Sequence, residues 1–208
     1  MNKKFPIKKI LKSKQYYLKY IDIKNNLLKE INFKQLDQII ALIKKAIKSK
    51  NIIYTCGNGG SASLADHFAC DFTKQLSNKT NLKAKSISLS SNFALISAIA
   101  NDINFNDIYS YQVDKFCNKN DLLFIFSVSG NSLNCVKAAV TAKKKGLKTV
   151  SFTGFNGGKL SKLTNLNINF RTSNYGIAED CQISIMHYLS QYIRNIYLSP
   201  NKFKKTHF

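Results

Sequence analysis

The stretch CGNGGSASLADHFACD, at residues 56–71, decides how this sequence folds and where its chemistry lies. It follows the apolar run NIIYT, and it places three glycines within four residues before His67 and Asp71. A hairpin turn would explain the glycines, but it would not explain a His and an Asp four residues apart. Side chains with that spacing share one face of a helix, so the stretch predicts a glycine loop that opens a helix with an ionisable face.

Apolar and amphipathic segments alternate along the chain from residue 51 onward. The apolar runs suit buried parallel strands, and the segments between them suit helices. This order predicts an α/β fold with a doubly wound, parallel five-stranded sheet flanked by helices, in which ligands bind beyond the carboxyl ends of the strands. The expected strands are 51–56, 84–90, 121–127, 148–154 and 166–171, and the expected helices are 61–77, 92–100, 107–117, 132–145 and 176–197.

Two more helices are expected before this unit, at 15–30 and 34–49, from apolar residues at helical spacing. Their apolar stripes, at 17–21 and 33–43, are expected to extend beyond what a lone α/β domain covers, which favours assembly of several subunits. The predicted organisation is an N-terminal helical arm at 1–50, an α/β domain at 51–200 and a basic tail at 201–208.

The charge of the chain is high, at a formal net value of +21 over 208 residues. Lysines are spread along the whole sequence, and Arg171 and Arg194 are the only arginines. Nucleic-acid sites usually cluster their charge and rely on arginine, so the pattern favours solvated charge over a nucleic-acid face. Scattered cysteines and the lack of an apolar run of about 18 residues predict a cytoplasmic protein that is neither secreted nor membrane-spanning.

Two of the expected strands end in loops rich in glycine, hydroxyl and amide groups. The first loop contains Asn58, Gly59, Gly60 and Ser61, and the second contains Ser127, Ser129, Gly130 and Ser132. Hydroxyls and the free N–H groups of a helix N-terminus can surround an oxyanion. Serine and asparagine also cap helices without binding a ligand, but two such loops at adjacent strand ends favour a small phosphorylated ligand.

Ionisable side chains follow on two of the expected helices. His67 and Asp71 share one face of the helix after the glycine loop, and Glu179 and His187 lie about 80° apart around the last helix. Either histidine could be structural, yet the chain has only three, and these two lie beside loops that end strands. The four side chains are therefore candidates for a single pocket.

Together these features resemble the sugar isomerase (SIS) domain family, and within it the phosphoheptose isomerases. The stretches that carry the resemblance are GNGGSASLADHFACD at 57–71, AIANDINFNDIYS at 98–110, SVSGNSLNCVKAA at 127–139, TGFNGGKL at 153–160 and the last helix as far as His187. The resemblance implies a flavodoxin-like topology, a homotetramer with sites at subunit interfaces, and one zinc ion per subunit.

The resemblance also implies a role for individual residues. Contact with the sugar phosphate is expected of Asn58, Gly59, Gly60, Ser61, Asn101, Asp102, Ser127, Val128, Ser129, Ser132 and Glu179. The metal position falls on His67, Asp71, Glu179 and His187, and Asp71 and His187 are expected to act as the acid–base pair. The implied reaction is aldose–ketose isomerisation of sedoheptulose 7-phosphate to D-glycero-D-manno-heptose 7-phosphate through an enediol, in a pathway such as lipopolysaccharide heptose synthesis.

Two positions depart from the family pattern. The usual catalytic Glu is here Asp71, whose carboxylate is shorter by one C–C bond of about 1.5 Å, and the usual Gln of the last helix is here Glu179. Either the pocket has adjusted to the shorter side chain, or the substrate differs, or the chemistry is lost. The alternative function is a non-catalytic sugar-phosphate sensor or a partner-binding protein of the replication-initiator-associating type, because fold alone does not fix function.

Overall fold

Five parallel strands form one sheet in the computed structural model of the protein, which describes residues 4–203. The strands are β1 (Ile53–Gly57), β2 (Ser86–Ser88), β3 (Leu122–Ser127), β4 (Lys148–Thr153) and β5 (Leu166–Asn169). Their order across the sheet is β2-β1-β3-β4-β5, with every neighbouring pair parallel. This is the flavodoxin-like order, so the predicted doubly wound α/β fold is confirmed.

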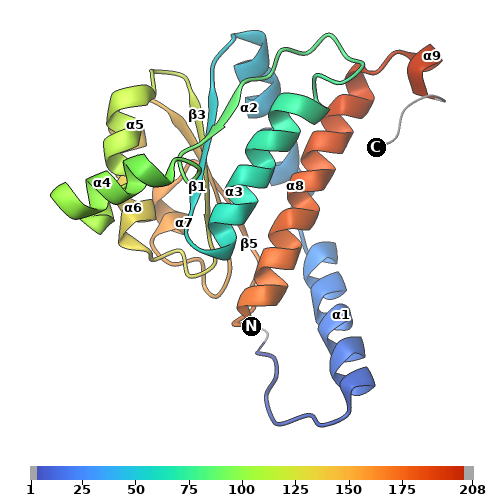
Figure 1. Ribbon diagram of the computed structural model, residues 1–208. Coiled ribbons are helices and arrows are strands. Elements are labelled where there is room, and N and C mark those ends of the chain that lie inside the picture. Colours follow the sequence, from blue (N-terminus) through green and yellow to red (C-terminus); the bar gives the residue numbers. More distant parts are fainter. Residues whose placement is uncertain (1–3, 204–208) are drawn as a thin grey trace.

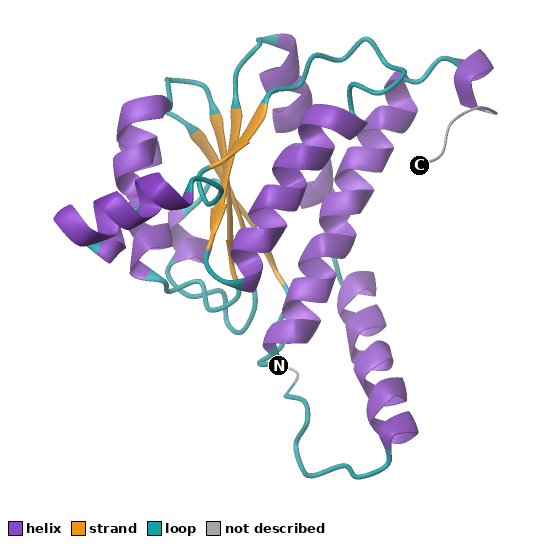
Figure 2. Cartoon of the chain, viewed as in Figure 1, coloured by secondary structure: helices purple, strands orange, loops and turns teal. Residues whose placement is uncertain are grey.

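Helices cover both faces of the sheet (Figures 1 and 2). One face carries α2 (Phe33–Lys48), α3 (Gly60–Cys70) and α8 (Tyr175–Tyr197), and the other carries α4 (Phe93–Asp102), α5 (Ser110–Phe116), α6 (Leu133–Lys144) and α7 (Leu160–Leu163). The remaining helical segments are α1 (Ser13–Lys29), η1 (Asp71–Gln75), η2 (Phe105–Asp107) and α9 (Pro200–Phe203). The described part of the chain contains no helix that is both long and apolar enough to cross a bilayer.

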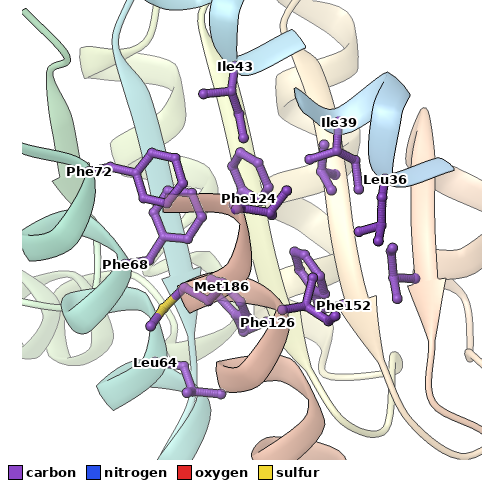
Figure 3. Packing of buried hydrophobic residues seen from close by; sticks show 14 of the residues in the cluster. Leu36, Ile39, Ile43, Leu64, Phe68, Phe72, Phe124, Phe126, Phe152 and Met186 are labelled. Atoms are coloured by element: carbon purple, nitrogen blue, oxygen red, sulfur yellow. The ribbon is translucent and has the colours of Figure 1, made fainter. Parts of the chain in front are cut away.

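The largest fully buried side chains of the described residues are phenylalanines, and they lie in the core between the sheet and the first helical face (Figure 3). The rings of Phe68 and Phe72 stack with their centroids 3.9 Å apart, and Phe68 also packs against Phe124 of β3. Full burial of each such side chain stabilises the fold by about 1.5–3 kcal/mol relative to exposure. This packing fixes α3 and α8 beside each other over the sheet, and these two helices carry both histidines of interest.

The two predicted stripes of the N-terminal helices have different surroundings. Leu36, Ile39 and Ile43 of α2 are buried against the sheet, so the chain itself covers this part of the stripe at 33–43, contrary to expectation, whereas Phe33 at its start is 66% exposed. The outer face of α1 stays open, with Tyr17 62% and Leu18 56% exposed. The division of the chain at residue 50 stays a prediction, and the basic tail lies mostly outside the described residues.

The helix expected at 61–77 changes its form halfway. α3 ends at Cys70, and the next turn, η1, is π-helical, with the Leu76 N–H donating to the Asp71 carbonyl oxygen at 3.1 Å. Single π-helical turns are rare and occur often at functional sites. Here the wider turn starts at the carboxylate that departs from the family pattern.

Candidate active site

The glycine loop begins where β1 ends, and neighbouring segments hold its backbone. The Tyr109 hydroxyl donates a hydrogen bond to the Gly57 carbonyl, and the Ser90 hydroxyl accepts one from the Gly57 N–H at 3.2 Å. A Cβ at Gly57 would lie 2.5 Å from the Ser61 carbonyl oxygen, and Gly59 adopts a φ of 55°. Glycine meets both demands without strain, so the loop can turn tightly into the start of α3.

The serine loop, residues 127–132, is braced by the loop that follows β4. Gly130 adopts a φ of 64°, and a Cβ there would lie 2.1 Å from the Gly157 carbonyl oxygen. The Leu160 N–H donates to the Gly130 carbonyl, and the Lys159 N–H donates to Asn131 Oδ1, both at 3.0 Å. The loop at 153–159 therefore holds the backbone of the serine loop in place.

Two observations favour ligand binding over simple helix capping in these loops. Ser132 is the N-cap residue of α6, yet its side chain makes no capping hydrogen bond. The amides of Asn58 and Asn134 exchange two hydrogen bonds, of 2.9 and 3.0 Å, which tie the glycine loop to α6. The loops are thus tied together, and Ser132 at the N-terminus of α6 lies beside both of them, where the free N–H groups of a helix can bind an anion.

The two loops and the start of α8 enclose a cavity of about 260 Å³, called here the phosphate cavity. Its lining consists of Asn58, Gly60, Ser61, Phe126, Ser127, Val128, Ser129, Ser132, Tyr175 and Glu179. Eight of the eleven residues predicted to contact substrate line it, and Gly59 forms the turn beside it. The sequence prediction that both loops meet in one place therefore agrees with the geometry.

Asn101 and Asp102 do not line this cavity. They form the last turn of α4, on the opposite helical face, where both are exposed and the Asn101 amide donates to Asp102 Oδ1 at 2.8 Å. Within one chain they stay apart from the other predicted residues, and their contact with a substrate remains a prediction.

His67, Asp71 and His187 form a cluster where α3 and η1 meet α8. The His67 Nε2 lies 3.6 Å from Asp71 Oδ1, the His187 Nε2 lies 3.9 Å from Asp71 Oδ2, and the two Nε2 atoms are 3.4 Å apart. Asp71 is 8% exposed, whereas both imidazoles reach solvent. A second cavity, of about 190 Å³, opens onto the cluster and is also lined by Gln75, Ser190, Gln191 and Arg194.

These three side chains have the spacing of metal ligands. Zinc binds nitrogen and oxygen at about 2.0–2.2 Å, so neighbouring ligands in a tetrahedral site stand about 3.4 Å apart. All three candidate ligand atoms lie within 4.8 Å of one another, close to that separation. The cluster is therefore a possible metal-binding triad that leaves a position for a further ligand.

Glu179 is not part of this cluster, although it was predicted to be a metal ligand. It lies eight residues before His187, which is about 12 Å along a helix. Its carboxylate instead abuts the glycine loop, since a Cβ on Gly60 would lie 2.6 Å from Glu179 Oε1. Burial, and secondarily the charge of Asp180, raises the pKa of Glu179.

Several residues around these cavities carry little signal in the sequence. Tyr175 lines the phosphate cavity from the first turn of α8, where no periodic pattern or motif marks it. Arg194 is 2% exposed and reaches the second cavity, and its Nε donates to the Asn78 carbonyl at 3.3 Å. Its rarity in a lysine-rich chain was the one available signal for a special position.

Comparison with known proteins agrees with this geometry. The family model for the SIS domain matches residues 15–154. The phosphoheptose isomerase of Helicobacter pylori (strain P12) is 35% identical over 167 residues, which cover 80% of this chain and 86% of that protein. That of Escherichia fergusonii is 34% identical over 173 residues, covering 81% and 88%. The structure of phosphoheptose isomerase GmhA from Neisseria gonorrhoeae has a TM-score of 0.79 at 25% identity, covering 88% of this chain and 96% of that one.

A parallel α/β sheet with a polar cavity at the carboxyl ends of its strands defines a small-ligand-binding class of protein. The chain belongs to the SIS-domain family, and within that family to the phosphoheptose isomerases, a group of isomerase enzymes.

Proposed function

We propose that the protein interconverts sedoheptulose 7-phosphate and D-glycero-D-manno-heptose 7-phosphate through an enediol. One observation carries the proposal: the same two helices, α3 and α8, border the phosphate cavity near their N-termini and hold the His67–Asp71–His187 cluster further along. The relatives named phosphoheptose isomerase support the choice of substrate.

The spacing of the two parts suits a seven-carbon sugar phosphate. Gly60 and His67 are separated by seven residues, or about 10 Å along a helix. An extended heptose phosphate, built from C–C bonds of about 1.5 Å, is on the order of 10 Å long. With its phosphate held by Ser127, Ser129 and Ser132, such a substrate would place its carbonyl end beside the cluster. Asn58, Ser61 and Glu179 then lie where they can hydrogen-bond the sugar hydroxyls.

Asp71 and His187 are assigned to the proton transfers. The Asp71 carboxylate would remove the proton from the carbon beside the carbonyl and return it to the neighbouring carbon. His187 would move the proton between the two substrate oxygens as the enediol forms and collapses. His67, in contact with both groups, would orient the carboxylate.

The donor set also fits a divalent cation. We propose zinc, at one ion per subunit, held by His67, Asp71 and His187, because zinc favours such nitrogen and oxygen ligands. When bound there, the ion would supply Lewis-acid stabilisation to the oxygens of the substrate in place of proton movement by His187, and one oxygen of Asp71 would stay available as the base. Elemental analysis of protein purified without chelator tests this, and a fully active protein that stays free of metal after zinc is offered would contradict it.

A homotetramer with active sites at subunit interfaces is part of the same proposal. It is supported by the exposed apolar side chains of α1 and by the position of Asn101 and Asp102, which a single chain leaves outside the cavity. The predicted cytoplasmic location stays a prediction.

The direct test of the reaction is incubation with sedoheptulose 7-phosphate and product analysis by NMR. The expected result is the aldose heptose 7-phosphate. A protein that binds the sugar phosphate and leaves it unchanged would instead be a sensor or a partner-binding protein.

A further inference from the structure

A third cavity, of about 650 Å³, lies at the amino-terminal end of the strands, opposite the phosphate cavity. It is formed by the end of α2, the segment before β2 and the last turn of α8. Figure 1 shows α2 and the end of α8 at the end of the strands opposite the β1–α3 connection. We call it the lysine cavity, and its lining is Lys44, Lys45, Ile47, Lys48, Lys50, Asn81, Leu82, Lys83 and Tyr197.

The charge around this cavity is of one sign. Five of its nine lining residues are lysines and none is acidic, although only 32 of the 208 residues in the chain are Lys or Arg. Among residues 4–203, no ion pair involves any of the five lysines. Like charges gathered around a concave surface focus the potential there and attract an anion of several charges.

Helix-end chemistry explains only part of this gathering. Lys45 and Lys48 belong to the last turn of α2, where cations interact favourably with the helix dipole. Lys50 lies beyond the helix end, and Lys83 comes from a separate segment before β2. Two separate stretches of chain thus bring positive charge to one hollow that is large enough for a small ligand.

We propose that the lysine cavity binds a small polyphosphate anion, either an inorganic polyphosphate or the phosphate chain of a nucleotide. Lysine binds phosphate as a flexible point charge, so several of them can follow a phosphate chain without fixed geometry. Apolar side chains of Ile47 and Leu82 also line the hollow, and the Tyr197 ring lies 5.9 Å from Lys44 Nζ. This lining gives an organic group attached to the phosphates a surface to contact.

The test is calorimetric titration of the full chain with tripolyphosphate at two salt concentrations. We expect saturable binding at one site per chain that weakens as salt rises. The double variant Lys45→Gln, Lys48→Gln should weaken it by about tenfold or more, because two charge-assisted contacts are lost. The matched control is Lys143→Gln, Lys144→Gln, which removes two exposed lysines from the last turn of α6, away from the cavity.

Each outcome of this experiment has a definite meaning. A loss of tripolyphosphate affinity that is confined to the cavity variant supports the site. A second titration, with ATP, then identifies the ligand. Tighter binding of ATP than of tripolyphosphate indicates a nucleotide, and binding that is no tighter indicates an inorganic anion. Equal losses in both double variants, or no saturation, overturn the proposal. A single-stranded oligonucleotide that displaces tripolyphosphate at matched charge would also overturn it, in favour of a nucleic-acid surface. Isomerase turnover is a separate measurement, so the anion site and the proposed isomerase activity are tested independently of each other.

Discussion

The shorter carboxylate of Asp71 still contacts both imidazoles of the cluster, at 3.6 and 3.9 Å. It begins the π-helical turn η1, so the backbone widens at the residue where the side chain is shorter. We propose that the pocket has adjusted to Asp, and the other two alternatives are outcomes of the following test. The family position that is usually Gln is here Glu179, and its raised pKa reflects burial beside the glycine loop.

Substitutions at Asp71 separate an adapted pocket from a decayed one. Asp71→Asn keeps the shape and removes the base, so turnover should fall by about 10²–10⁴ with little change in substrate affinity. Asp71→Glu should also lower the rate in an adapted pocket, because the extra methylene misdirects the carboxylate. Steady-state kinetics of both variants checks this. Activity that rises in Asp71→Glu would indicate a site that has lost its function in the native chain.

Glu179 should make the stability of the protein depend on pH. Because its pKa is raised above the ordinary value of 4.5, the folded state binds the proton more readily than the unfolded state. Stability is therefore lost as pH rises from about 4.5 through the raised pKa. The side chain of the Glu179→Gln variant does not titrate. The melting temperature of the variant, relative to that of the native protein, should therefore increase between about pH 4 and pH 8. A difference that is constant across this range would contradict the assignment.

At the scale of elements, two loops and two helices build the site. The glycine and serine loops end β1 and β3, which are neighbours in the sheet, and the Asn58–Asn134 pair joins them. α3 and α8 then lead from these loops to the histidines. Different parts of the same elements would thus hold the phosphate end and the reacting end of the proposed substrate. Mutations at the two ends should therefore have separate effects on binding and on turnover.

Removing hydroxyls from the serine loop should affect binding and leave folding intact. Ser129→Ala, Ser132→Ala should weaken sugar-phosphate affinity, since a hydrogen bond to a charged group contributes about 1.5–3 kcal/mol. Calorimetry measures the affinity and thermal melting checks the fold. The control is Ser97→Ala, Ser184→Ala, whose hydroxyls bond helix carbonyls outside the cavity. Equal affinities in all three proteins would remove the serine loop from the site.

The sequence predicted these elements well because each prediction was local. Strand runs, the glycine and serine loops and the i, i+4 pair of His67 and Asp71 all depend on residues close together in the chain. The prediction that Glu179 and His187 share one pocket was less accurate, because it used only the angle between them around the helix. The two residues are also separated by about 12 Å along the helix axis. The lysine cavity is lined by three segments that are distant in the sequence, and the apolar side chains of α2 are buried by contact with the sheet. Local periodicity predicts neither of these arrangements.

At the scale of the whole molecule, apolar side chains stay exposed on α1 and around α4. Tyr17 and Leu18 lie on α1, and Phe93, Ile103 and Phe105 lie at the two ends of α4 or just after it. Monomeric proteins seldom expose contiguous apolar patches of large size, and such patches usually mark contact surfaces. Both regions are therefore candidates for contacts between subunits.

Assembly can be tested on the α1 surface. Light scattering should give the mass of a tetramer at micromolar concentration, and Tyr17→Ser, Leu18→Ser should shift it towards smaller species, since apolar contact area is lost. Val140→Ser is a suitable control, because it removes an exposed apolar side chain from α6, outside both regions. A native protein that has the mass of a monomer would refute the tetramer and any site that depends on a second subunit.

In the proposed reaction, Asp71 moves a proton between adjacent carbons of a heptose phosphate. Its most direct test is NMR of sedoheptulose 7-phosphate incubated in deuterated water with the native protein or with Asp71→Asn. We expect the native protein to introduce deuterium at the carbon beside the carbonyl as the aldose forms, and Asp71→Asn to do so more slowly by about 10²–10⁴. Native protein that binds the sugar phosphate but exchanges no C–H proton, or equal exchange in both proteins, would contradict it.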